Sequence, residues 1–178
     1  MIEISSAEID DLDEILAVHR VAFGSNIESS LVLALINDPT AHPVFSLVAK
    51  DQDQVVGHIL FTRASFDPEV DLSLSILAPL AVSPNNQGKG IGGALIEQGL
   101  RQLTEHGVDL VFVLGYPDYY TRYGFKPAGS VGFEATYPIP EHLSDAWMFK
   151  TLSSDPVGRY RGKVVCAACL DQPEYWAE

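Results

Sequence analysis

The segment LAVSPNNQGKGIGGAL, residues Leu80–Leu95, decides the fold of this chain. It opens with apolar residues typical of a strand and continues through a polar turn. Four glycines then fall within six positions, at Gly88, Gly90, Gly92 and Gly93, directly before an amphipathic helix. The first N–H groups of a helix lack partners, the helix dipole favours an anion, and glycine lets a ligand approach the backbone. The segment therefore predicts a phosphate-binding turn and a phosphorylated cofactor.

The composition indicates one globular domain over residues 1–178. The chain is 47% hydrophobic, which is enough apolar material for a full core at this length. It contains no apolar run of membrane-spanning length, and Met1–Ile4 lacks the basic start and apolar stretch of a secretory signal. We expect a cytoplasmic protein with no membrane partner.

The charge balance bears on the partners. The formal net charge is -13, from 24 acidic and 11 basic residues, and a charge of this sign repels nucleic acid and anionic membranes. It favours a cationic acceptor, although the same charge also serves solubility.

The order of the elements predicts an α/β (α+β) fold with a mixed sheet and helices on both faces. A helix over about 7–23 follows a short first strand, and a second helix covers about 27–36. A proline at position 79 interrupts the strand expected over 72–82, and proline cannot donate to a strand ladder. The remaining expected elements are strands at 44–49, 55–62 and 110–114, a helix at about 90–106, a short helix around 119–123, and C-terminal strands within about 145–170.

Gln87–Gly92 matches the Q/R-x-x-G-x-G/A signature of the GNAT superfamily of acetyl-CoA-dependent N-acyltransferases. The strand before it and the segment Tyr119–Pro127 after the next strand resemble a bacterial subgroup of predicted acetyltransferases. The resemblance is strongest over 77–128, extends back to Ile2 and fades after Ala128. It implies a mostly antiparallel sheet of about six or seven strands in which the fourth and fifth strands splay apart.

The resemblance also implies the cofactor site. Acetyl-CoA would be the acyl donor, with its pantetheine arm paired to the backbone of the splayed fourth strand, where Pro79 disturbs the ladder. Lys89 stands at the rim of the turn, where a phosphate contact and an ordinary solvated lysine are both open readings. The expected cofactor-binding residues are Leu80, Ala81, Val82, Gln87, Gly88, Lys89, Gly90, Ile91, Gly92 and Gly93.

Tyr120 matches the position of the tyrosine that protonates the departing CoA thiolate in many GNAT enzymes. A phenol stays protonated at neutral pH and can give its proton to a thiolate in the transition state. Tyr119 and Tyr123 have the helical spacing of core residues, and we expect them to pack.

The implied mechanism is direct attack by a primary amine of a small molecule or peptide, without an acyl-enzyme, with backbone N–H groups near Leu80–Val82 stabilising the oxyanion. No residue is assigned as the base. The acidic loop of Asp67, Glu69 and Asp71 is one candidate, acting through water.

The glycine motif and the fold also allow other interpretations. Gly88–Gly93 also spells the dinucleotide fingerprint G-x-G-x-x-G, but several strands precede it and the acidic ribose partner about 20 residues further on is missing. A GNAT-like domain that binds acyl-CoA or a partner without catalysis remains the alternative function. The acceptor, the acyl chain preference and the oligomeric state, including a homodimer, stay open.

The two cysteines do not indicate a metal or redox site. Cys166 and Cys169 lie in an apolar run, 163–170, that reads as a strand, where residues three apart point to opposite faces. The five histidines show no ligand spacing, so no metal is expected.

Overall fold

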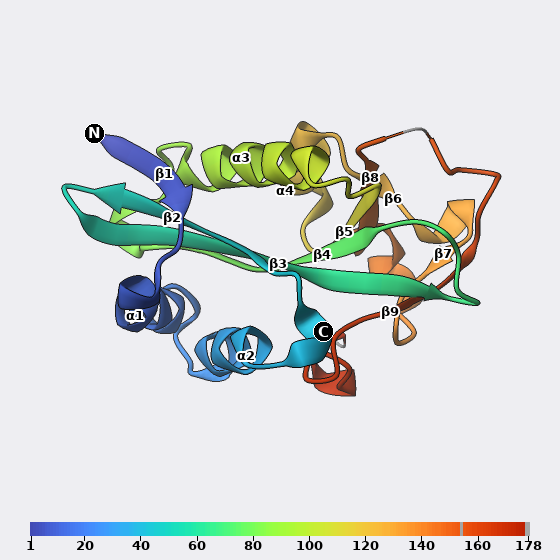
Figure 1. The fold of residues 1–178 in the computed structure, drawn as a ribbon, viewed down its shortest axis with the longest axis horizontal. Helices are drawn as coiled ribbons and strands as arrows, with labels where there is room; N and C mark the ends of the chain where they lie inside the picture. The colour runs from blue at the N-terminus through green and yellow to red at the C-terminus, as the bar shows by residue number, and fades with distance from the viewer. Residues whose placement is uncertain (154, 177–178) are drawn as a thin grey trace.

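A computed structural model describes residues 1–153 and 155–176. Its centre is a nine-stranded sheet whose main path runs β1-β2-β3-β4-β5-β8-β6, with β9 beside β3 and β7 beside β9 (Figure 1). The expected mixed, mostly antiparallel sheet is confirmed, and the two-residue strands β6 and β7 account for the higher strand count. The strands are β1 (Ile2–Ser6), β2 (Phe45–Asp51), β3 (Gln54–Asp67), β4 (Leu74–Val82), β5 (Leu110–Leu114), β6 (Lys126–Pro127), β7 (Phe133–Glu134), β8 (Trp147–Thr151) and β9 (Gly162–Val165).

Helices cover both faces of the sheet. Helices α1 (Leu12–Phe23) and α2 (Ile27–Ile36) lie on one face, and α3 (Ile91–Glu105) and α4 (Pro117–Tyr120) lie on the other (Figure 1). The apolar stripe of α3 packs on the sheet, because Gly57 of β3 leaves room for the side chains of Ile91 and Leu95. None of the helices among the described residues is long and apolar enough to cross a bilayer.

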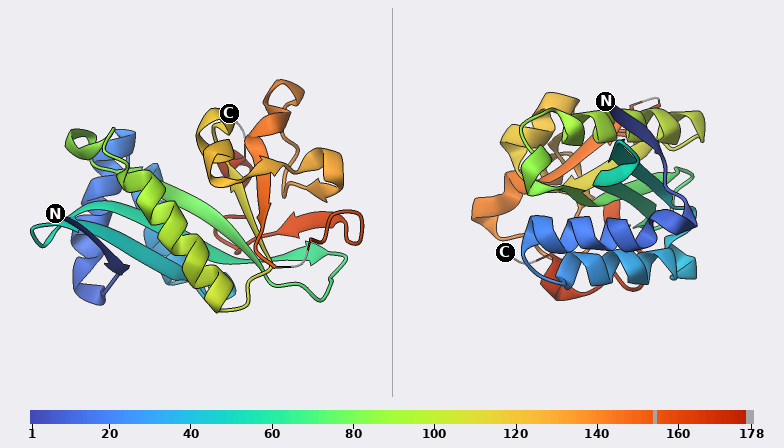
Figure 2. Two further views of the ribbon diagram at one scale, coloured as in Figure 1. Left: turned by 90° about the horizontal axis from the view of Figure 1, so that it is seen from above. Right: turned by 90° about the vertical axis from the view of Figure 1, so that its left-hand side faces the viewer.

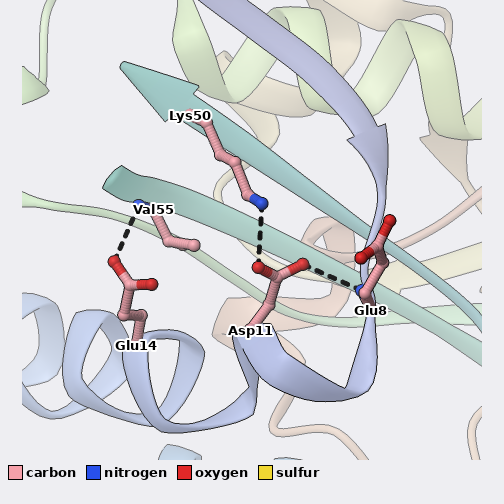
Figure 3. Close-up of polar contacts among 5 residues, drawn as sticks. All are labelled: Glu8, Asp11, Glu14, Lys50 and Val55. Carbon is pink, nitrogen blue, oxygen red and sulfur yellow. Dashed lines mark hydrogen bonds and ion pairs between the residues drawn. The ribbon is translucent and has the colours of Figure 1, made fainter. Parts of the chain in front are cut away.

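The first long helix begins later than expected. The prediction of a helix from about residue 7 is wrong, since a 3-10 turn at Ile9–Asp11 precedes α1. Asp11 explains the delay: one of its carboxylate oxygens accepts the N–H of Glu8 at 2.8 Å, and the other pairs with Lys50 Nζ at 2.9 Å (Figure 3). The carboxylate thus stabilises a 3-10 turn at the place where a continuous helix would have its first turn.

Figure 3 also shows how α1 is fixed to the sheet. The Glu14 carboxylate accepts the N–H of Val55, at 3.2 Å, from the start of β3. Together with the Lys50 pair, this contact ties the first turn of α1 to both strands of the β2–β3 hairpin. The position of α1 over the sheet is therefore set by backbone and ionic contacts as well as by apolar packing.

Strands β4 and β5 separate after three residues of parallel pairing. Leu74, Ser75 and Ile76 pair with residues 110–112 of β5, and no later residue of β4 pairs with β5. β4 continues to Val82, and its register with β3 shifts between Ile59 and Phe61, beside Pro79. Figure 2 shows the two strands diverging in its left panel. The splay implied by the resemblance is confirmed.

The C-terminal segment departs from the expected strand over 163–170. β9 ends at Val165, and the chain then turns, with Leu170 N–H donating to the Ala167 carbonyl at 3.0 Å. The prediction that Cys166 and Cys169 lie on opposite faces of one strand is therefore wrong. The turn forms because its N–H groups bind the loop after α2: the amide of Cys169 donates to the Asp38 carboxylate at 3.1 Å. Both cysteines are free thiols.

The face under α1 carries a buried histidine pair. His19 of α1 and His58 of β3 are both 0% exposed, and their ring nitrogens Nε2 and Nδ1 lie 2.8 Å apart. Burial lowers the pKa of His19 to about 4 and, together with the nearby His19, lowers the pKa of His58 well below its usual value. Both rings are neutral at pH 7.

We expect the protein to lose stability as the pH falls from about 6.5 to about 4. In this range the unfolded chain binds protons that the folded histidines reject, so the free energy of unfolding decreases by about 3 kcal/mol from His19 alone. Urea unfolding at a series of pH values measures the decrease. His19→Gln should flatten the curve, whereas replacement of the exposed His142 by Gln should leave it unchanged.

Candidate active site

The glycine turn has the backbone geometry that a phosphate site needs. Gly88 and Gly90 adopt left-handed φ angles of 76° and 80°, which disfavour any other residue, and added Cβ atoms there would meet nothing within 4 Å. The turn thus curls around open space. It follows a short 3-10 turn at Pro84–Asn86, which leads the chain from the end of β4 to the start of α3.

The start of α3 keeps its donors unpaired. Gly90 is the N-cap, and no side chain among the described residues caps the helix. The first helical hydrogen bond runs from Ala94 N–H to the Gly90 carbonyl at 3.0 Å. The backbone N–H groups before it, in the first turn, have no partner within the helix and carry the positive end of its dipole. An anion placed in the turn would satisfy them.

The other two glycines have a second reason to be small. A Cβ on Gly92 would collide with the hydroxyl of Tyr119, and one on Gly93 with the hydroxyl of Tyr123. Both phenols therefore rest on bare helix backbone at the first turn of α3. We expected these tyrosines to be packing residues; their rings are half-buried and packed, and their hydroxyls also border the predicted phosphate site.

Tyr120 is the last residue of α4, and its ring lies beside the end of β5. Its ring covers Gly115, where a Cβ would collide with it, and it packs edge-on against Tyr119 and Phe125. Gly115 directly follows β5, so the phenol is beside the gap that opens after Phe112. The ring is 9% exposed, and its hydroxyl has no hydrogen-bond partner within residues 1–153 and 155–176.

The protonation states in this tyrosine cluster suit an acid. Burial, with a smaller effect of Tyr119, raises the pKa of Tyr120 above its ordinary value. Burial and the neighbouring Tyr123 raise the pKa of Tyr119 to about 12, although the guanidinium of Arg122 opposes this shift from 4.9 Å above the ring. Both phenols therefore carry their protons throughout the physiological pH range.

The predicted strand contacts lie where β4 has lost its β5 partner. Leu80, Ala81 and Val82 pair with β3 on one side, opposite residues 59, 58 and 57. Their other edge has no strand beside it among the described residues. The Gln87 side-chain amide donates to the Val82 carbonyl at 3.0 Å and so ties the glycine turn to the end of this strand.

The acidic loop does not lie at the gap. Asp67 ends β3, and Glu69 and Asp71 precede β4, whose residues Leu74–Ile76 still pair with β5 and lie between this loop and the gap. At about 3.3 Å per residue, the extended chain from Asp71 to Leu77 spans about 20 Å. The suggestion that these carboxylates assist the attacking amine is wrong.

An open cavity of about 680 Å³ continues from the tyrosine cluster along the outer face of α3. Tyr123 lines this cavity, and its hydroxyl also contacts Gly93 in the first turn of α3, so the two spaces adjoin. Sequence reasoning did not identify the cavity, since its wall combines α3 with a segment after α4 and with β8. The charged residues lining it are Arg101, Arg122, Lys150, Glu97 and Glu105.

Comparison with known proteins agrees with this geometry. A family model described as an acetyltransferase (GNAT) domain matches residues 3–128, which is most of the chain. The chain belongs to the GNAT acetyltransferase family. It is 46% identical over 159 residues to the N-acetyltransferase YjhQ of Escherichia coli K12, covering 88% of this chain and 87% of that protein.

Two solved GNAT structures share the fold. The Escherichia coli protein YhbS, solved in complex with CoA, superposes with a TM-score of 0.87 at 30% identity and covers 96% of this chain and 92% of its own. A GNAT acetyltransferase from Brucella melitensis, solved with acetyl-CoA, gives a TM-score of 0.77 at 30% identity, with 96% and 98% covered. This GNAT protein is an acyltransferase of the N-acetyltransferase type, and the sheet with splayed β4 and β5 is that of its family.

Gly92→Ala should weaken CoA binding by about 10-fold to 100-fold. The added Cβ displaces the Tyr119 hydroxyl into the space before α3, and the loss of one or two charge-assisted hydrogen bonds costs about 1.5–3 kcal/mol. Isothermal titration with CoA measures the change. Gly129→Ala is the matched control, because a Cβ at position 129 meets nothing within 4 Å. Equal affinities for both variants would contradict the tight contact.

Proposed function

We propose that the protein transfers the acetyl group of acetyl-CoA to a primary amine by direct attack, with Tyr120 as the general acid. The observation that carries this proposal is the Tyr120 phenol, protonated and without a hydrogen-bond partner in the described part of the chain, beside the point where β4 and β5 separate. A thioester threaded through that gap would place its sulfur next to a proton donor.

Acetyl-CoA binding is supported by two adjoining features of the structure and by two solved relatives. The uncapped start of α3 offers N–H groups to the diphosphate, and the free edge of Leu80–Val82 offers backbone groups to the pantetheine amides. The relatives YhbS and the Brucella melitensis enzyme were solved with CoA and acetyl-CoA. The proposed cofactor residues are Leu80, Ala81, Val82, Gln87, Gly88, Lys89, Gly90, Ile91, Gly92 and Gly93.

The roles of the four glycines differ in this proposal. Gly88 and Gly90 shape the turn through their positive φ angles, whereas Gly92 and Gly93 let Tyr119 and Tyr123 approach the helix. Lys89 is exposed at the rim of the turn. Three cationic side chains line the adjoining cavity, Arg101, Arg122 and Lys150, against two carboxylates, Glu97 and Glu105, and this positive excess favours the phosphorylated adenosine end of the cofactor there.

In the chemical step, the amine lone pair attacks the thioester carbonyl. Backbone N–H groups of β4 stabilise the oxyanion, and the proton of Tyr120 passes to the sulfur as the C–S bond breaks. The acceptor is a small molecule or a peptide amine, and the net charge of -13 favours a cationic one.

Tyr120→Phe should lower turnover by about 10²-fold or more while CoA affinity is retained, because the ring packing survives and only the proton donor is lost. The assay incubates acetyl-CoA with a panel of amines and follows free thiol release, with CoA titration alongside. Tyr137→Phe is the matched control, because its hydroxyl donates to the Asp171 carbonyl, in the C-terminal segment.

Unchanged turnover in Tyr120→Phe would refute the acid role. CoA binding by the wild type without thiol release on any amine would instead favour a non-catalytic acyl-CoA-binding domain.

A further inference from the structure

A chain of three polar side chains crosses the sheet on the face opposite α3. Ser46 of β2 lies with Oγ 2.8 Å from His58 Nε2, and His58 Nδ1 lies 2.8 Å from His19 Nε2. The proposed mechanism leaves these groups unused. Their order, hydroxyl to ring to ring, is that of a proton relay, since each member both donates and accepts.

The His19 end of this chain of side chains is unpaired. His19 Nδ1 has no hydrogen-bond partner within the described residues, although the ring is 0% exposed. A buried polar atom without a partner destabilises the folded state, so packing alone does not account for it. Phe23 stacks on His19 and is itself 44% exposed, which puts the ring one side chain below the surface.

This chain of side chains also lies close to the strand that has separated from β5. The register places His58 opposite Ala81, in the part of β4 that has lost its β5 partner. Ala81 packs in the same apolar cluster as Ile15 and Val18 of α1, so its side chain is on the histidine face. Helix α1 crosses this face from the β1 edge towards the side where α4 lies, and His19 is in its second half (Figure 2). The other end, Ser46, is partly exposed on β2.

This face is where an acceptor would arrive. The proposed cofactor site lies on the α3 face, so a thioester passing between β4 and β5 presents its carbonyl to the opposite side. An alkylamine reaches it as an ammonium ion and must lose a proton before it attacks. The carboxylates of the β3–β4 loop are too distant, whereas the histidine pair adjoins the splayed strand.

We propose that His19, His58 and Ser46 relay the proton of the acceptor ammonium from the gap to solvent. This inference rests on the proposed acetyl transfer and supplies its missing base. The ammonium proton passes to His19 Nδ1, the Nε2 proton of His19 to His58 Nδ1, the Nε2 proton of His58 to Ser46 Oγ, and the Ser46 hydroxyl proton to water. The freed nitrogen lone pair forms the amide bond as the C–S bond breaks.

The relay also closes the proton balance of the cycle. Tyr120 becomes a phenolate when it protonates the sulfur, and the reverse shift along the chain returns one proton to it from water at Ser46. The second proton of the attacking nitrogen, which the amide does not keep, passes to solvent water, so each turnover releases one proton. Both rings are neutral at pH 7, so each has one N–H and one lone pair, as a relay requires. Among the charged groups on the packed elements, Lys50 and Asp11 are paired with each other, and the Glu14 carboxylate accepts the N–H of Val55.

The test compares two acceptors that differ in protonation. Benzylamine is an ammonium ion at pH 7, whereas aniline is mostly neutral and needs no base before attack. In His58→Gln we expect kcat/KM to fall about 10²-fold with benzylamine and less than about 2-fold with aniline. Ser46→Ala, which removes the outlet, should show a smaller loss of the same kind. His142→Gln serves as control, since His142 is exposed.

An equal loss with both amines, or no loss with either, would overturn the relay and leave a structural pair. If the wild type binds CoA but acetylates neither amine, the proposed acceptor class fails, and nuclear magnetic resonance of ¹⁵N-histidine-labelled protein decides on the relay. We then expect both rings to exchange between tautomers, and Ser46→Ala to shift the His19 signals. Locked tautomers with His19 signals insensitive to Ser46→Ala would refute it.

Discussion

The loss of pairing between β4 and β5 organises the whole molecule. After Ile76 the two parallel strands diverge, and the backbone of Leu77–Val82 has a ladder on its β3 side alone. Backbone N–H and C=O groups inside a protein need partners, so a free strand edge in the middle of a sheet calls for another chain or a ligand. In a GNAT acetyltransferase, we interpret this free edge, the start of α3 and the tyrosines of α4 as parts of one site.

The two faces of the sheet present different groups around that gap. On one face, α3 begins without a side-chain cap, and the tyrosines of α4 close over its first turn and over the end of β5. On the other, α1 sits on an apolar layer that contains the buried polar chain from His19 to Ser46. In the proposed transfer, such a division would let the donor and the acceptor approach from opposite sides of the sheet.

Much of the site could be predicted because its signals are local. The glycine turn, the apolar strand before it and the helix after it follow from the backbone preferences of adjacent residues, and the structure has each of them. Errors arose where distant contacts override local preference. Asp11 closes a turn in place of the first helical turn, and Asp38 draws residues 166–170 away from the strand that their apolar pattern indicates.

By itself, the sequence determined the acyltransferase family, the turn at Gly88–Gly93 and the tyrosine segment after β5, because neighbouring residues encode backbone geometry directly. Only the tertiary structure decided which side chains meet across the sheet. His19 and His58 are 39 residues apart, and their contact depends on the register of β3 and the placement of α1. The pairing of β4 also keeps the acidic loop away from the gap. The distance between two loops depends on the length and pairing of the strands between them, which no local sequence pattern sets.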